Sequence, residues 1–117
     1  MDGGPASADV LLQVTDALQA AGNLSRPGQP APEGDSLEVY VDGGVRRGQH
    51  AVKALALGAR AVFVGRPAFW GLIVGGQKGV EGVMRGFQDE VERAMALCGV
   101  RSVDEIDASL LASSETA

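Results

Sequence analysis

Two short apolar runs with a helical segment between them constrain the fold more than any other feature of the sequence. Residues 37–41 ("LEVYV") and residues 61–64 ("AVFV") carry the β-branched and aromatic side chains that are typical of buried strands. The stretch between them, "RGQHAVKALALG", places apolar side chains at helical spacing and ends in a glycine. A strand–helix–strand order predicts parallel strands joined by a crossover helix. The sequence therefore predicts an α/β fold.

Helical spacing of apolar residues also occurs on both sides of this unit. Residues 9–21 are predicted to form a helix that Ser7 or Asp9 caps and that Gly22 ends. Residues 68–76 ("AFWGLIVGG") are apolar but interrupted by glycines, which favours a short helix or a turn.

A long amphipathic helix is predicted over residues 80–98, with Gly99 as its end. Its apolar face is formed by Val80, Val83, Met84, Phe87, Val91, Ala94, Met95 and Cys98. We therefore expect Cys98 to be a core residue. The acidic residues expected on the solvated side of the same helix are Asp89, Glu90 and Glu92. Ser102 and Glu105 form a capping-box signature for a last short helix.

Two segments have no apolar periodicity. Residues 23–36 ("NLSRPGQPAPEGDS") are rich in proline and glycine, which predicts a flexible loop. This loop is long for a connection inside a compact domain. Residues 111–117 are predicted to form a disordered tail.

Composition excludes several kinds of partner. The chain has 117 residues and a net charge of −5, which argues against nucleic acid or an anionic membrane as its main partner. No apolar run reaches the roughly 18 residues that a membrane span needs. The single cysteine excludes an internal disulfide, and one cysteine with one histidine cannot form a structural zinc site. We expect a soluble intracellular chain.

Each predicted strand ends in glycine and arginine. The first runs into residues 42–46 ("DGGVR") and the second into residues 65–67 ("GRP"). Because the carboxyl ends of neighbouring parallel strands lie at one edge of a sheet, we expect the two loops to lie side by side. Glycines let backbone N–H groups approach an anion, helix N-termini add partial positive charge, and guanidinium groups match phosphate. The two loops therefore predict a phosphate-binding site.

These loops and the segments around them resemble a known family. The run "VYVDGGVRRGQHAVKALALGARAVFVGRP" resembles the last two strands of the FMN-dependent L-2-hydroxy-acid oxidases and dehydrogenases, which include glycolate oxidase. The run "AFWGLIVGGQKGVEGVMRGFQDEVERAMALCGVRSVDEI" resembles the closing helices of that family, and "MDGGPASADVLLQV" is similar to the stretch before its seventh strand. The resemblance implies a partial (β/α)8 TIM barrel over residues 1–110, made of the last two βα units plus the closing helices. It also implies that residues 23–36 are an insertion, because relatives connect these elements briefly.

The resemblance implies FMN as the cofactor. It further implies that the complete enzyme is a homo-oligomer that oxidises a small L-2-hydroxy acid to a 2-oxo acid, with oxygen as the acceptor giving hydrogen peroxide. Arg46 and Arg66 are expected to contact the FMN phosphate. Asp42 is expected to bond a ribityl hydroxyl or nearby backbone, since like charges repel. The FMN-binding residues that the resemblance implies are Asp42, Gly43, Gly44, Val45, Arg46, Gly65 and Arg66.

No catalytic residue is assigned to this chain. By the resemblance, the catalytic histidine and an arginine for the substrate carboxylate lie in a His-Gly-Gly-Arg stretch just upstream of the part that matches Met1. We therefore expect the isolated chain to be inactive, and His50, on the predicted helix, is not expected to replace that histidine. The family alone points to the peroxisome. The C-terminal "ETA" is not a Ser-Lys-Leu-type signal, so no compartment is predicted.

Two other classes stay open from the sequence. Another phosphate-binding TIM-barrel protein would also place glycine and arginine on these loops. A non-catalytic truncated module that pairs with another chain would have the same strands and helices. A flavin absorbance spectrum of the complete protein distinguishes the first class from the flavin family. The coding DNA upstream of Met1 distinguishes the second class, because an in-frame His-Gly-Gly-Arg run there would make the chain a fragment of an enzyme.

Overall fold

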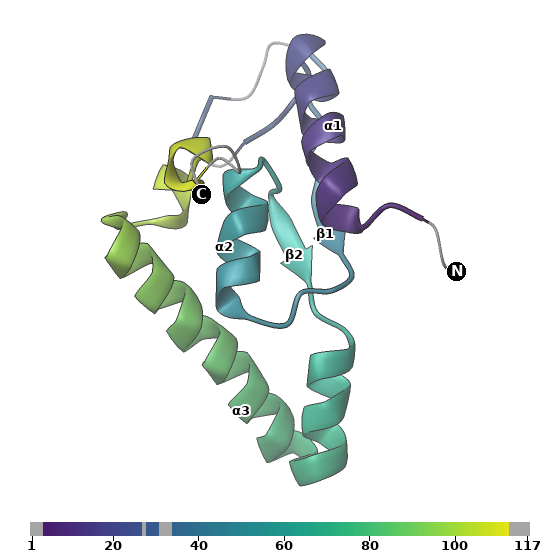
Figure 1. Ribbon diagram of the computed structural model, residues 1–117, viewed down its shortest axis with the longest axis vertical. Helices are drawn as coiled ribbons and strands as arrows, with labels where there is room; N and C mark the ends of the chain where they lie inside the picture. Colours follow the sequence, from purple (N-terminus) through teal and green to yellow (C-terminus); the bar gives the residue numbers. More distant parts are fainter. Residues whose placement is uncertain (1–3, 27, 31–33, 113–117) are drawn as a thin grey trace.

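The computed structural model describes residues 4–26, 28–30 and 34–112. Within these ranges the chain forms three helices, two short strands and two 3-10 helices (Figure 1). In chain order they are α1 (Ser7–Ala20), β1 (Tyr40–Asp42), α2 (Gly48–Ala56), β2 (Ala61–Phe63), α3 (Arg66–Cys98), η1 (Val103–Glu105) and η2 (Ala108–Leu110). This order is the α/β alternation that the sequence predicts.

The two strands are adjacent and parallel, as predicted. Tyr40 pairs with Ala61, and Asp42 pairs with Phe63. Side chains alternate between the two faces of a sheet. Val41 is buried in a cluster with residues of α1 and α2, whereas Tyr40 and Phe63 are 53% and 56% exposed. Helices therefore cover one face of the sheet, and the other face is open within the described part of the chain.

The first strand differs from the predicted 37–41 because its beginning pairs elsewhere. Leu37 forms an isolated parallel bridge with Leu24. The N–H of Ser25 donates to the carbonyl oxygen of Leu37 at 2.9 Å, and the N–H of Leu37 donates to that of Asn23 at 2.7 Å. Leu24 is buried, so the start of the 23–36 segment is anchored to the core. Residues 27 and 31–33 of that segment lie outside the described ranges.

Helix α1 begins earlier than the predicted residue 9. Ala6 is its N-cap, and neither Ser7 nor Asp9 makes the predicted capping bond. Its end matches the prediction, since Gly22 follows it with a positive φ of 73°.

The segment α3 consists of two helical arms. Gly75 and Gly76 have non-helical backbone angles and separate the arms, so the segment predicted as a short helix or a turn is a short helix. A Cβ atom on Gly71 would lie 2.7 Å from the carbonyl oxygen of Gly79, so the backbones of the two arms touch where only glycine fits. Figure 1 shows the arms meeting in a sharp V.

Two small clusters form the core of the described residues. One joins Leu11, Val41, Ala54 and Ala59. The other joins Val52, Ala56 and Ile106, and packs against the second arm of α3. Helix α2 contributes to both clusters, so it is the central element of the described fold.

The end of α3 departs from the sequence prediction. Cys98 is exposed, so the expectation that it is a core residue is wrong. The packed side of the helix ends at Met95, and the chain returns to the same cluster through Val100, Leu110 and Leu111. Leu111 belongs to the segment predicted as a tail, and residues 113–117 lie outside the described ranges. No helix in the described ranges is long and apolar enough to cross a membrane.

Candidate phosphate-binding site

A cavity of about 280 Å³ lies at the carboxyl ends of β1 and β2. The residues that line it are Asp42, Gly43, Gly44, Val45, Arg46, Phe63, Gly65, Arg66, Pro67 and Trp70. The structure therefore brings together all seven residues that the sequence singles out. Phe63, Pro67 and Trp70 complete the wall.

The first loop has a backbone shape that requires glycine. Gly43 and Gly44 have φ values of 98° and 74°, in the left-handed region that other residues rarely adopt. A Cβ atom on Gly44 would meet no atom within 4 Å, so this side of the loop is open. Val45 next to it is buried, which fixes the loop to the core. In the described part of the chain, the N–H groups of Gly44 and Val45 make no backbone hydrogen bond.

The second loop places the start of a helix at the cavity. Gly65 is the N-cap of α3 and Arg66 is its first residue, and both line the cavity. Helix N-termini have unsatisfied N–H groups and a partial positive charge. The site therefore combines a helix end with the side chains of Arg46 and Arg66, all of which favour an anion.

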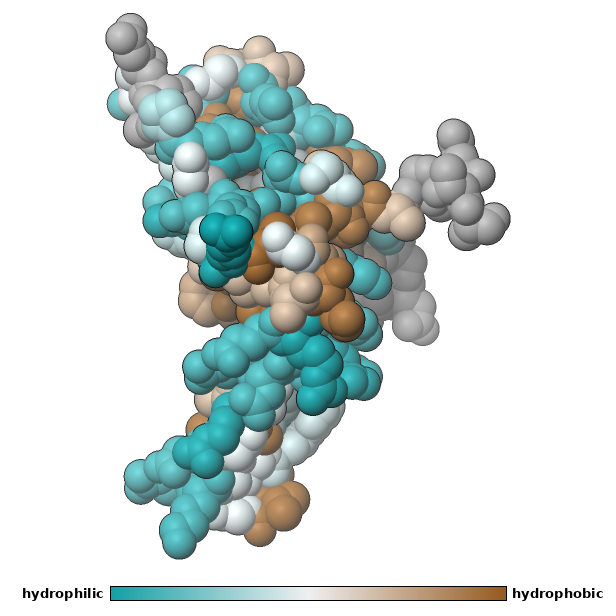
Figure 2. All heavy atoms as spheres, turned by 90° about the vertical axis from the view of Figure 1, so that its left-hand side faces the viewer, coloured by the Kyte–Doolittle hydropathy of each residue, from teal (hydrophilic) through white to brown (hydrophobic). Residues whose placement is uncertain are grey.

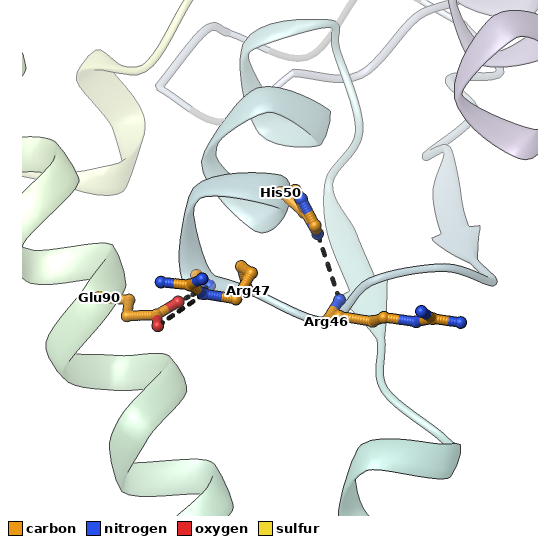
Figure 3. A network of polar contacts seen from close by, with 5 residues as sticks. Arg46, Arg47, His50 and Glu90 are labelled. Atoms are coloured by element: carbon orange, nitrogen blue, oxygen red, sulfur yellow. Dashed lines mark hydrogen bonds and ion pairs between the residues drawn. The ribbon is translucent and has the colours of Figure 1, made fainter.

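Arg46 is held by two contacts. Its guanidinium carbon lies 5.9 Å from the centre of the Trp70 ring, within the range of a cation–π interaction. Its backbone N–H donates to Nδ1 of His50 at 3.3 Å. Figure 3 shows the side chains of Arg46 and Arg47 extending in opposite directions. His50 thus contacts the backbone of the loop.

Arg47 pairs with a residue of α3. Its Nε atom lies 2.9 Å from Oε1 of Glu90, and Oε2 of Glu90 accepts the N–H of Gly48 at 2.6 Å (Figure 3). The Gly48 N–H, and then the Arg47 guanidinium, hold the pKa of Glu90 below its ordinary value of 4.5. The expectation that Glu90 lies on the solvated side of the helix is therefore wrong, because its carboxylate contacts Gly48 and Arg47.

Gly48 allows this contact. A Cβ atom there would lie 2.7 Å from the backbone nitrogen of Val91 and 2.8 Å from the carbonyl oxygen of Phe87. Helical periodicity misses Glu90 because its partner is 42 residues away in the sequence. The third glycine of "DGGVRRG" is the one local signal of a close approach at this point.

The fold and the cavity define an α/β protein with an anion-suited site at the ends of two parallel strands. The model of the FMN-dependent dehydrogenase family matches residues 1–113, and the chain belongs to that family. This confirms the resemblance to the FMN-dependent 2-hydroxy-acid oxidases. FMN is the cofactor of the family.

Several curated proteins are similar to the chain. It is 43% identical over 111 residues to 2-hydroxyacid oxidase 1 of Mus musculus, an alignment that covers 95% of this chain and 26% of that protein. It is 45% identical over 111 residues to an L-lactate oxidase of Roseobacter sp. (strain GAI101), with the same coverage. The chain thus spans about a quarter of the length of these relatives.

Solved structures give the same result. The recombinant flavin-binding domain of baker's yeast flavocytochrome b2 matches with a TM-score of 0.80 and 37% identity, over 94% of this chain and 25% of that chain. A mandelate oxidase structure matches with a TM-score of 0.70 and 37% identity, over 88% of this chain and 27% of that chain. The described fold therefore corresponds to one part of a larger flavoenzyme fold.

Proposed function

We propose that this chain is the FMN-phosphate-binding C-terminal portion of an oxidoreductase that acts on L-2-hydroxy acids. The observation that carries the proposal is the cavity at the ends of β1 and β2, which is lined by all seven residues singled out from the sequence. Membership of the FMN-dependent dehydrogenase family supplies the cofactor. The names of the similar proteins, 2-hydroxyacid oxidase and L-lactate oxidase, supply the substrate class.

The residues of the cavity fit the phosphate end of FMN. Gly44 offers an open side and an N–H without a backbone partner in the described chain. Arg46 and Arg66 would supply guanidinium groups to the phosphate, and the first turn of α3 would add its partial charge. Asp42 would accept a hydrogen bond from a ribityl hydroxyl, because a carboxylate next to the phosphate is repelled. When bound, FMN supplies the acceptor for the two electrons removed from the hydroxy acid.

The complete protein would convert an L-2-hydroxy acid to a 2-oxo acid, with oxygen as the final acceptor and hydrogen peroxide as the second product. This chain would contribute cofactor binding and no acid–base group. Its one histidine, His50, uses Nδ1 for the N–H of Arg46. A general base must lie within reach of the proton that it abstracts. The catalytic histidine is therefore proposed to lie in another part of the protein.

The open face of the sheet supports a place for this chain in a barrel. Tyr40 and Phe63 project from that face and contact each other edge-to-face, with ring centres 6.0 Å apart. A barrel interior is filled by side chains from all of its strands. We propose that β1 and β2 are the last two strands of a (β/α)8 barrel and that six further strands cover Tyr40 and Phe63.

A second candidate function follows from the same open face. A module without a catalytic histidine, with two strands and an uncovered face, could act by pairing with another chain. The coding DNA upstream of Met1 distinguishes the two. An in-frame His-Gly-Gly-Arg sequence there supports the enzyme, and a stop codon directly upstream supports the pairing module.

The test of phosphate binding uses FMN and riboflavin, which differ only in the phosphate. Charge-assisted hydrogen bonds contribute roughly 1.5–3 kcal/mol each, and the loss of translational and rotational freedom on association opposes them. We therefore expect an FMN dissociation constant of about 1 mM for the 117-residue chain. Riboflavin should bind at least about 10-fold more weakly. The measurement is quenching of flavin fluorescence.

Two variants and one control locate the binding. Arg46→Ala and Arg66→Ala should each weaken FMN binding by about 10-fold and leave riboflavin binding unchanged. The control is Arg101→Ala, which removes an exposed arginine outside the cavity. The proposed phosphate site would be refuted if FMN and riboflavin bound with equal affinity. It would also be refuted if Arg101→Ala weakened FMN binding as much as Arg46→Ala and Arg66→Ala.

A further inference from the structure

We infer that Glu90 is a positioning residue for the phosphate-binding loop: it fixes the N-terminus of α2 and keeps Arg47 away from the cavity, so that Arg46 alone of the two adjacent arginines serves the phosphate. This inference rests on the proposed function of the cavity. It assigns different roles to two residues that the sequence presents as an equivalent pair, "RR".

The Glu90 carboxylate lies at the start of α2. Its Oε2 accepts the N–H of Gly48, the first residue of α2, at 2.6 Å. Residue Arg47, the N-cap of α2, makes no side-chain cap bond to its own helix. Glu90 therefore takes the place of a capping residue, although it comes from α3. Two later N–H groups of the turn, those of His50 and Ala51, both donate to the carbonyl oxygen of Arg47.

Glu90 also forms an ion pair with Arg47. The other carboxylate oxygen of Glu90 lies 2.9 Å from Nε of Arg47, so one side chain holds both the helix end and the arginine before it. Charge-assisted contacts of this kind are shorter and stronger than neutral hydrogen bonds. Arg47 is 60% exposed and would otherwise be free to reach a nearby anion. The pair fixes its direction, which Figure 3 shows as opposite to that of Arg46.

The capped residue Gly48 is close in the chain to Arg46, which lines the proposed phosphate cavity. Arg46 and Glu90 both line a groove of about 550 Å³ between the arms of α3, and Arg46 and Trp70 line both this groove and the proposed phosphate cavity. Only Arg47 separates the capped residue Gly48 from Arg46. A shift of the helix start would therefore move Arg46 and the N–H groups before it. Small displacements of a binding group are costly because binding depends on geometry.

The capping contact is tested by amide hydrogen exchange at single-residue resolution on the 117-residue chain. Gly48, at the start of α2, has no partner for its N–H in the preceding turn, so its protection reports the Glu90 contact. Glu90→Ala should lower the protection factor of Gly48 by about 10-fold while α1 stays protected. Glu90→Gln keeps an amide oxygen that can accept the Gly48 N–H, so the protection factor of Gly48 should fall by less.

The matched control is Asp89→Asn, which removes a charge from the neighbouring exposed position of the same helix. This variant should leave the protection factor of Gly48 unchanged. The pH profile adds a signature that packing alone would not produce: wild-type Gly48 should lose protection as pH falls through the pKa of Glu90, and Glu90→Gln should show no such step. Arg47 and Arg93 are the charged groups that act on Glu90.

A second experiment adds FMN at millimolar concentration, and inorganic phosphate as a smaller probe, to the same chain. FMN should slow exchange at residues 43–46 and 65–66 in the wild type, with about 3- to 10-fold weaker affinity in Glu90→Ala and no change in Asp89→Asn. Unchanged Gly48 protection in both Glu90 variants, or equal FMN affinity in all variants, would overturn the inference. If FMN changes no exchange rate in the wild type, while the protection of the Gly48 amide still depends on Glu90, the proposed phosphate site is refuted instead.

Discussion

Helix α2 and the first arm of α3 show opposite relations to the rest of the chain. Five of the nine residues of α2 are buried, and the helix contributes to both core clusters. In the first arm of α3, one residue is buried, Gly71, while Ile73 and Val74 are 66% and 88% exposed. Figure 2 shows polar side chains along the outer side of α3 and an apolar patch at its tip. The apolar side chains of α2 are packed within the chain, whereas the first arm of α3 has apolar surface without a partner in the described chain.

The same contrast holds across the sheet. Val41 points into a packed cluster, while Tyr40 and Phe63 on the other face are more than half exposed. Large apolar patches on a protein surface mark sites of interaction. The packing of this chain is therefore concentrated around α2, and Tyr40 and Phe63 lie on the face that we propose further strands cover.

The largest expected effect concerns association. The open sheet face and short strands invite pairing with other chains, so the 117-residue chain should sediment as oligomers or aggregates and melt without a sharp transition. Replacing Tyr40 and Phe63 with glutamate should reduce this association, and this double variant is the background in which the unfolding of the variants below is measured. Sedimentation velocity with calorimetry is the measurement. A monodisperse wild-type monomer with a two-state melt would show that the chain is a complete domain.

The next effect compares the two helices directly. Ala56 is fully buried in α2, so Ala56→Asp places a carboxylate among apolar side chains and should destabilise the fold by more than about 3 kcal/mol. Val74→Asp, at an 88% exposed position, should change stability by less than about 0.5 kcal/mol. Urea unfolding followed by circular dichroism measures both. Similar losses in the two variants would contradict the contrast between α2 and the tip of α3.

A third effect concerns the contact between the arms of α3. A Cβ atom on Gly71 would lie 2.7 Å from a backbone oxygen of Gly79, so Gly71→Ala should separate the arms and cost about 1–3 kcal/mol. Gly82 is in the same helix with no atom within 4 Å of its Cβ position. Gly82→Ala should therefore stabilise the helix by roughly 0.5–1 kcal/mol. The two alanine variants differ in sign, and a shared sign in thermal unfolding would exclude the close contact.

The sequence predicts the local parts of this structure better than its long-range contacts. The parallel strands and the helix breaks at Gly22 and Gly99 follow from periodicity and glycine chemistry, which are local. The convergence of the two strand ends also follows, because the topology of parallel strands leaves one arrangement for their loops. The role of these loops in binding FMN stays a proposal.

The errors share a cause. Cys98 has the helical spacing of a core residue, but the buried cluster that packs against α3 reaches only as far as Met95 in the described chain. Glu90 has the spacing of a solvated residue, but it meets the end of a helix that is distant in sequence. Leu37 pairs with Leu24 across a segment that carries no periodic signal. In each case the outcome depends on a neighbour that no local pattern identifies.

The smallest expected effect is a difference in acid stability between wild type and Glu90→Gln. The N–H of Gly48 and the Arg47 guanidinium lower the pKa of Glu90 in the folded chain below the ordinary value of 4.5. A carboxyl with a lowered folded pKa stabilises the fold above its unfolded pKa, and this contribution is lost as pH falls through the folded pKa. The advantage of the wild type over Glu90→Gln should therefore be present at neutral pH and disappear in acid below pH 4.5. Asp107, whose pKa is lowered by its hydrogen bonds to Ser109, contributes an acid loss to both proteins, so only their difference reports Glu90. Urea midpoints measured across this range decide the point: an advantage that persists or grows in acid would show that the Glu90 contact does not depend on its charge.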